Sequence, residues 1–223
     1  MRKTGRCAAI SLLILVLLPL APTAAALEPM PREWEAVEQP LADGARHADL
    51  WHTGWGLFHG GGLAANLYLS SEADSPATRF DARVSAVKSA LALGDLALNP
   101  LPHRVSRDRV QALRQEAADA RSNLARAEAI LARTAEIERQ RRSWSSQLGG
   151  LVVNAAGGLI IALGDDRPGD GVVSFALGMA VNTAQTWSQP TQASRAGAAR
   201  DESLAGRWRL SVSARHVAVA VAW

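Results

Sequence analysis

Three long runs of residues without Lys, Arg, Asp or Glu stand out in the hydrophobic and polar pattern of the chain: residues 50–69, 148–164 and 171–187. Runs of this length are typical of helices that are buried in a core or that cross a membrane. Only the short polar segment 165–170 separates the second run from the third. The pattern therefore predicts an apolar helical hairpin over residues 148–187, with a tight polar turn at its tip.

Two further segments have an amphipathic pattern. Residues 104–147 contain neither Gly nor Pro, and their apolar positions alternate in steps of three and four: Val110, Leu113, Ala117, Ala120, Leu124, Ala127 and Leu131. This predicts one long helix that either packs on a small bundle or forms a coiled-coil arm or dimer. A second helix is expected over residues 79–98, with Val84, Val87 and Leu91 on one face and Arg83 and Lys88 on another, ended by the proline-containing segment 99–102.

The remaining segments of the chain are expected to connect or extend this helical part. Residues 27–48 are rich in Pro and acidic residues and are interpreted as a linker or loosely docked arm, and residues 191–206 as a second linker. Apolar residues alternate with Arg, Ser and Ala over residues 207–223, which predicts a short pair of β-strands. The expected fold is an all-α, mostly helical bundle over residues 49–190, with the Gly- and Asn-rich hairpin at its centre.

Each uncharged run contains one asparagine and several small residues. Gly150, Asn154 and Gly158 follow one another at intervals of four, as do Ser174, Gly178 and Asn182. On a helix this spacing produces one narrow face without bulk, which lets two backbones approach closely while the amides hydrogen-bond across the contact. We expect a helix-packing interface formed by these residues together with Asn66, whether the helices pack in lipid or in an ordinary soluble core: Asn66, Gly150, Asn154, Gly158, Ser174, Gly178 and Asn182.

The amino-terminal 26 residues have the order of a signal peptide. Arg2, Lys3 and Arg6 precede an apolar run, and a small-residue stretch that ends at Ala26 offers a cleavage site. We therefore expect an exported protein of the bacterial cell envelope, in the inner membrane or the periplasm. Retention of this segment as a membrane anchor is the alternative, but the apolar run is short for a span.

Cleavage would change the cysteine content and the net charge of the mature chain. The cut would remove Cys7, the single cysteine, and three basic residues but no acidic ones, which leaves Lys and Arg equal in number to Asp and Glu. A mature chain without cysteine can form no disulfide and has no thiol nucleophile. Since nucleic-acid binding depends on an excess of basic residues, nucleic acid is not an expected partner.

No residue pattern points to a specific reaction. His52 and His59 would share a helix face, but seven residues is too far to chelate one metal ion without a third ligand. The turn from Asp165 to Asp170 has three carboxylates but lacks the spacing of a calcium-binding EF-hand loop. We expect no metal, no cofactor and no enzymatic activity, with an enzyme that uses His52, His59 or Asp165 as the least favoured alternative.

Membrane lipid is the favoured partner. Tryptophans lie at or near the ends of the uncharged runs, where indoles prefer to sit at membrane surfaces. If the three runs cross a membrane with the mature amino end outside, residues 70–147 and the arginines after Trp187 would be cytoplasmic. The favoured hypothesis is a non-enzymatic, membrane-associated envelope protein that can self-associate. The alternative is a soluble periplasmic binding or accessory protein, because runs so rich in Gly and Ala would gain little free energy from insertion into a membrane.

Overall fold

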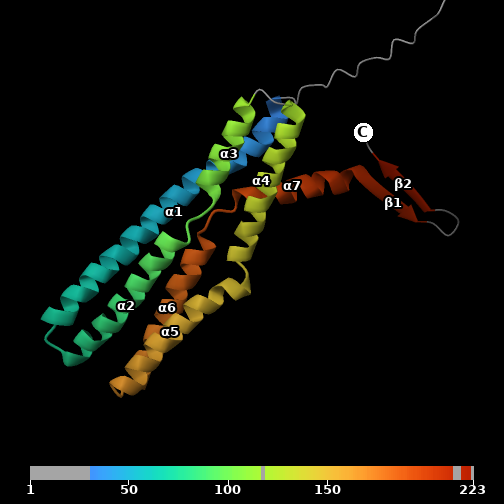
Figure 1. The fold of residues 1–223 in the computed structure, drawn as a ribbon. Helices are drawn as coiled ribbons and strands as arrows, with labels where there is room; N and C mark the ends of the chain where they lie inside the picture. Colours follow the sequence, from blue (N-terminus) through green and yellow to red (C-terminus); the bar gives the residue numbers. More distant parts are fainter. Residues whose placement is uncertain (1–30, 117–118, 213–216, 222–223) are drawn as a thin grey trace, which may run out of the picture.

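The computed structural model describes residues 31–116, 119–212 and 217–221, and the side chains up to residue 202. The elements are α1 (Pro31–Glu72), α2 (Pro76–Leu98), α3 (His103–Gln115), α4 (Ala120–Arg141), α5 (Trp144–Gly164), α6 (Pro168–Trp187), α7 (Gln192–Arg207), β1 (Trp208–Val212) and β2 (Val217–Val221) (Figure 1). The prediction of a mostly helical protein is confirmed. β1 and β2 pair as antiparallel strands. The structure does not describe the side chains of these strands, so the expected alternation of buried and exposed residues stays a prediction.

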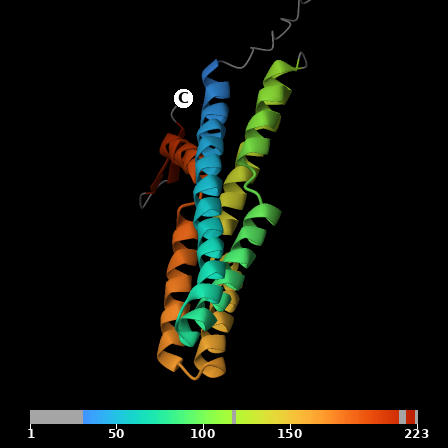
Figure 2. The ribbon, with the colours of Figure 1, turned by 90° about the vertical axis from the view of Figure 1, so that its left-hand side faces the viewer.

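The long helix α1 connects two differently built ends of the molecule (Figures 1 and 2). The first half of α1 packs with α3, α4 and α7, and we call this part the core end. The second half of α1, from Leu50, pairs with α2, and α5 pairs with α6; these two antiparallel hairpins form the hairpin end. The α1–α2 turn and the α5–α6 turn lie together at the far tip of the molecule (Figure 2).

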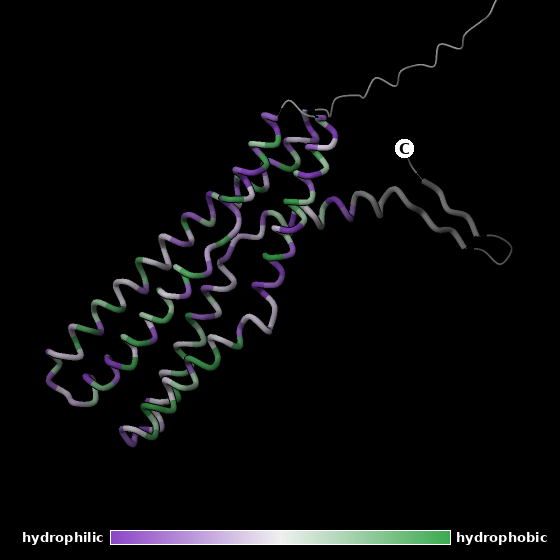
Figure 3. Tube along the Cα trace, viewed as in Figure 1, coloured by the Kyte–Doolittle hydropathy of each residue, from purple (hydrophilic) through white to green (hydrophobic). Residues whose placement is uncertain are grey.

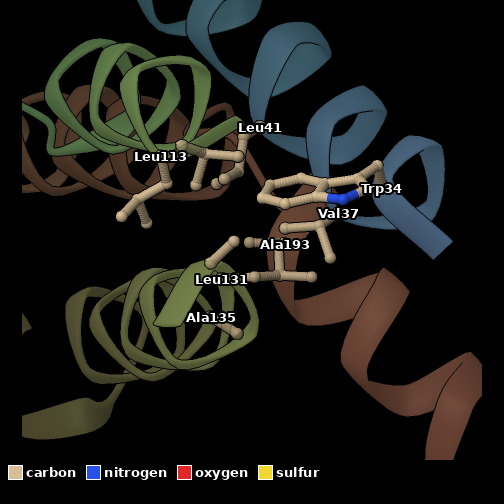
Figure 4. Packing of buried hydrophobic residues seen from close by; sticks show 9 residues of the cluster. Trp34, Val37, Leu41, Leu113, Leu131, Ala135 and Ala193 are labelled. Carbon is tan, nitrogen blue, oxygen red and sulfur yellow. The ribbon is translucent and has the colours of Figure 1, made fainter. Parts of the chain in front are cut away.

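A conventional apolar core holds the core end together (Figure 4). Trp34, Val37 and Leu41 of α1 recur at intervals of three and four, so they share one face of the helix. They pack against apolar residues of α3, α4 and α7: Val110, Leu113, Ala127, Leu131, Ala135 and Ala193. Four residues of the predicted seam, Val110, Leu113, Ala127 and Leu131, are therefore packed inside one chain on a small bundle, and Ala117 lies outside the described residues.

The expected linkers and the single long helix are wrong. Helix α1 begins at Pro31 and includes the supposed arm, and α7 occupies the supposed linker 191–206. Residues 104–147 form three helices, because Asp119 caps the start of α4 and Ser143 precedes α5. The chain reverses direction between α3 and α4. The apolar faces of both helices can therefore cover the start of α1, which one straight helix could not do.

A buried polar cluster joins four helices of the core end. His103 of α3 and Glu138 of α4 have side chains that are 1% exposed, and His103 Nε2 lies 2.8 Å from Glu138 Oε1. The backbone N–H groups of Ala193 and Ser194 donate to the same carboxylate, so Glu138 caps the start of α7. The ring of His103 also lies against Gly44, where a Cβ would be 2.7 Å from His103 Cδ2.

This cluster predicts an acid-dependent stability. Burial tends to raise the pKa of Glu138, but its hydrogen bonds with His103 and the α7 backbone outweigh burial and lower the pKa below its ordinary value of 4.5. A lowered native pKa stabilises the fold above about pH 4.5, and this contribution is lost as the pH falls through the native pKa. Glu138→Gln should lower the free energy of unfolding at pH 7 by about 2 kcal/mol and flatten its dependence on pH below 5.

Denaturant unfolding at pH 7 and pH 4 measures both effects. Glu136→Gln is the matched control on the same helix, because its ion pair with Arg139 is exposed to solvent and should contribute little. Equal pH dependence for Glu138→Gln and the unmodified protein would contradict the assignment.

Candidate binding groove between two hairpins

The two hairpins of the hairpin end enclose a groove of about 1120 Å³. Residues of α1 and α2 line one side of the groove, and residues of α5 and α6 line the other. At its end nearest the core end, Trp51 Nε1 donates to the carbonyl of Gln185, and His59 Nε2 lies 3.0 Å from Gln185 Oε1. These contacts hold α1 against the end of α6.

The α5–α6 hairpin is packed through glycine. A Cβ on Gly158 would lie 2.7 Å from the carbonyl oxygen of Gly171, and a Cβ on Gly171 would lie 2.5 Å from that of Gly158. Further along, the amide of Asn182 covers Gly150, and the amide of Asn154 covers Gly178. The small residues at intervals of four thus meet those of the partner helix, and each asparagine occupies the space that a glycine leaves.

The hydrogen bonds of the asparagines differ from the expectation. Asn182 donates across the interface, from Nδ2 to Gln147 Oε1 at 2.7 Å, and Asn154 Nδ2 makes a weaker contact across it, 4.0 Å from Met179 Sδ. Asn154 and Asn66 donate to carbonyl groups one turn earlier in their own helices, those of Gly150 and Gly62. An i−4 carbonyl is within reach of a short amide side chain, and spacing in the sequence cannot tell this bond from a bond to a neighbouring helix.

The predicted packing residues also line the groove. Gly150, Asn154, Ser174, Gly178 and Asn182 all contribute to its wall, and Asn66 lines it from α1, so Asn66 faces the hairpin α5–α6 across the groove and does not belong to the α5–α6 contact. Gly158 lies at the contact itself.

Three charged residues of α2 face the groove at intervals of seven: Asp81, Lys88 and Asp95. Asp95 Oδ1 accepts a hydrogen bond from Asn99. Burial lowers the pKa of Arg141, and the negative charge of Asp95 opposes part of that shift. The sequence interpretation placed Val87 and Lys88 on different faces of this helix without assigning either face to the interior. In the structure Val87 is 60% exposed and Lys88 lines the groove.

Arg167 joins the tips of the two hairpins. Its guanidinium bonds Asp81 of α2, Asp165 of the α5–α6 turn and Asp170 of α6. The hydrogen bonds with Asp81, and then those with Asp165 and Asp170, raise the pKa of Arg167 above its ordinary value. Arg167 therefore forms ion pairs with two of the three carboxylates of the turn. The third residue, Asp166, has a left-handed backbone conformation with φ 53°.

Lys88 occupies the middle of the groove. Its Nζ lies 3.2 Å from the carbonyl oxygen of Ser174 and 3.5 Å from Ser174 Oγ. Glycine makes room for it, since a Cβ on Gly157 would lie 3.0 Å from Lys88 Cδ and one on Gly178 would lie 2.8 Å from Nζ. Within the described ranges, no carboxylate lies within ion-pair distance of Lys88. The interval of seven from Asp81 to Asp95 was the one signal in the sequence that could have marked this face.

The histidines of the alternative metal hypothesis are not brought together with other ligands. His59 bonds Gln185 and stacks on Trp55, while His52 is exposed. Among the residues with described positions, no group of three or more His, Cys, Asp or Glu is arranged to hold a metal ion.

The outer surface of the hairpin end is apolar. Many large apolar side chains there are about half exposed or more and do not line the groove: Leu50, Leu57, Leu67, Tyr68, Val87, Leu98, Leu148, Val152, Leu159, Ile160, Leu163 and Val172. Figure 3 shows hydrophobic residues concentrated along α5 and α6, in contrast to the more hydrophilic α3 and α4. Helices α3 and α4 pack on α1 and do not cover this hairpin. By length and composition, one described helix, Trp144–Gly164, is apolar enough to cross a membrane, and 22% of its apolar window is buried.

The glycine contact gives a direct mutational prediction. Gly171→Ala should lower the stability of the folded protein by about 1–3 kcal/mol, because the new methyl group would meet the Gly158 carbonyl and Ala162. Gly169→Ala, two residues earlier in α6, is the matched control, since a Cβ there meets no atom within 4 Å. Thermal unfolding followed by circular dichroism compares the two. Equal melting temperatures would show that the helices do not approach as described.

Comparison of the chain with protein-family models, with curated proteins and with solved structures finds no match. The groove, the glycine contact and the polarity of the surface are therefore the observations from which a function is proposed.

Proposed function

We propose that the protein is a non-enzymatic membrane protein of the cell envelope, with the hairpin end embedded in lipid and the core end in water. The observation that carries the proposal is the reversed polarity of the hairpin end. Three charged residues of α2 and the asparagines of the hairpins face the groove, and Arg83 of α2 is exposed outside it. Val152, Leu163 and Val172 face outward with half or more of their surface exposed. Exposure of such an apolar surface to water is unfavourable in free energy, whereas lipid would cover it.

The dimensions of the hairpin end suit a bilayer. Helices α2, α5 and α6 have 23, 21 and 20 residues. At about 1.5 Å per residue each spans roughly 30 Å, the thickness of the hydrocarbon core. The uncharged stretch of α1 from residue 50 to residue 69 has the same reach. Four helices of matching length would therefore cross together.

Aromatic and charged residues lie where the two surfaces of the bilayer would be. Trp144 and Trp187 are exposed at the ends of α5 and α6 nearest the core end, and Trp55 Nε1 donates to Ser188 at the same level. Arg142 lies over the ring of Trp187, with 5.8 Å between its Cζ and the ring centroid. Tyr68 is exposed near the far tip. This distribution is that of interfacial anchors.

The proposal uses four crossings in place of the three expected from the uncharged runs. Helix α2 returns beside α1, and the ion pair between Arg167 and Asp81 holds the α1–α2 turn beside the α5–α6 turn. Residues 72–76 and 164–168 would thus share one side of the membrane, and α3, α4 and α7 the other. Helix α2 was predicted as a helix but not as a crossing because it carries charged residues, of which Asp81, Lys88 and Asp95 line the groove and Arg83 is exposed.

A soluble periplasmic binding protein is the second candidate, which the groove volume favours. Extraction of membranes with alkaline carbonate separates the two candidates. The proposal predicts that the full chain stays in the membrane pellet, because lipid covers the hairpins. Release into the supernatant would contradict it. The expected self-association stays a prediction, which the mass of the detergent-solubilised protein would test.

Single cysteines test the four crossings. In a Cys7→Ser background, Asp74→Cys and Asp166→Cys should react with a membrane-impermeant maleimide from the same side, and Arg109→Cys from the opposite side. Asp74 and Asp166 lie at the two tips, whereas Arg109 is exposed on α3. Labelling of positions 74 and 166 from opposite sides would contradict the proposed arrangement.

A further inference from the structure

The charge of Lys88 is not balanced within the groove. Its two nearest acidic neighbours on the groove face of α2 are seven residues away, about 10 Å along the helix axis. Asp81 is bound by Arg167, and Asp95 is bound by Asn99 near Arg141. Lys88 itself reaches only the carbonyl and hydroxyl of Ser174 among the described residues. An anionic partner would offset the hydration that this half-buried ammonium group loses.

Neutral hydrogen-bonding groups line the groove together with this ammonium group. Ser85 and Ser89 flank Lys88 on α2, and Asn66 lines the groove from α1. Ser174 lies opposite on α6. Hydroxyl and amide groups can donate to the oxygens of a bound anion while adding no charge of their own. Together with Lys88 they form a set of donors at mid-height of the groove.

The groove is large and carries apolar side chains beside these polar groups. Phe58, Leu91, Val153, Leu177 and Val181 contribute to its lining. A volume of about 1120 Å³ is slightly above the usual range for sites that bind small molecules and far exceeds the needs of a small inorganic anion. An occupant that fits this surface has an anionic group joined to an apolar body.

We propose that the groove binds an amphiphile, with a carboxylate or phosphate group held by Lys88 and an apolar chain lying between the hairpins. The negative group pairs with the ammonium and takes hydrogen bonds from the neighbouring hydroxyl groups. The chain covers the apolar lining of α2 and α6. The inference rests in part on the proposed membrane location, because lipid around the hairpins would strengthen the pairing.

Binding of cis-parinaric acid, a fluorescent fatty acid, tests the site. The full chain in nanodiscs of zwitterionic lipid is titrated with parinaric acid and, separately, with its neutral methyl ester, with empty nanodiscs as the blank. Energy transfer from the tryptophans to the polyene reports the bound ligand. The acid should bind at least about tenfold more tightly than the ester, because only the acid pairs with Lys88.

Variants assign the effect to Lys88. Lys88→Gln should weaken binding of the acid about tenfold or more and leave the ester unchanged, and Lys88→Arg should restore part of the affinity. Arg83→Gln is the matched control, since Arg83 is exposed on α2 and does not line the groove; it should bind like the unmodified protein. Equal binding of the acid by Lys88→Gln and the unmodified protein would overturn the proposal, as would equal affinity for acid and ester.

Competition experiments determine whether the site prefers a carboxylate or a phosphate. Laurate and dodecyl phosphate carry the same chain on a carboxylate and on a phosphate, and the one that displaces parinarate at lower concentration identifies the preferred group. Displacement by neither would overturn the proposal even if Lys88→Gln failed to fold. Lys88-dependent binding by a protein that carbonate releases would support the groove site and refute only the membrane location.

Discussion

A reversal of polarity along one long helix is the constraint on which the rest of the structure depends. Up to about residue 49, α1 buries Trp34, Val37 and Leu41 in a core built with α3, α4 and α7. Beyond that point several large apolar side chains of α1, such as Leu57 and Leu67, are turned outward, although Trp51 is buried. A single helix that buries its apolar residues at one end and exposes them at the other crosses from one solvent to another, or meets a partner that supplies the cover. Because α2, α5 and α6 beside it have similar lengths, lipid is the cover that we propose.

If the hairpin end lies in lipid, as proposed, hydrophobic burial cannot hold its helices together, because the surroundings are as apolar as the helices. Close backbone approach and a few polar contacts would then hold them together. Gly158 and Gly171 bring the backbones of α5 and α6 together, and Arg167 binds the tips of both hairpins. At the other end, the indoles of Trp51 and Trp55 share the hydroxyl of Ser188. The hairpins are thus fixed at both ends of the groove, and Lys88 is the charged group left between them.

The sequence shows some of these features openly and hides others. The small residues at intervals of four from Gly150 and from Ser174 were legible, because close helix packing requires small side chains at that spacing. The return between α3 and α4 was not legible, since no Gly or Pro interrupts residues 104–147 and the cap at Asp119 looks like any other acidic residue. The start of α1 was also hidden, because Pro40 and the acidic residues of this segment resemble a linker until Trp34, Val37 and Leu41 find a core. The position of Lys88 in the groove was also not legible, because the helical pattern separates its face from that of Val87 but only the tertiary arrangement shows which face turns inward.

The most direct measurement is the local environment of the outward side chains in a membrane. Nitroxide labels at Val152, Leu159 and Leu163, on a Cys7→Ser background, can be relaxed by oxygen, which dissolves in lipid, and by a water-soluble nickel chelate. The account predicts that oxygen relaxes labels at these positions strongly and the chelate weakly, while a label at Arg109 of the core end shows the opposite preference. Strong relaxation by the chelate at all three outward positions would place the hairpin end in water and contradict the account.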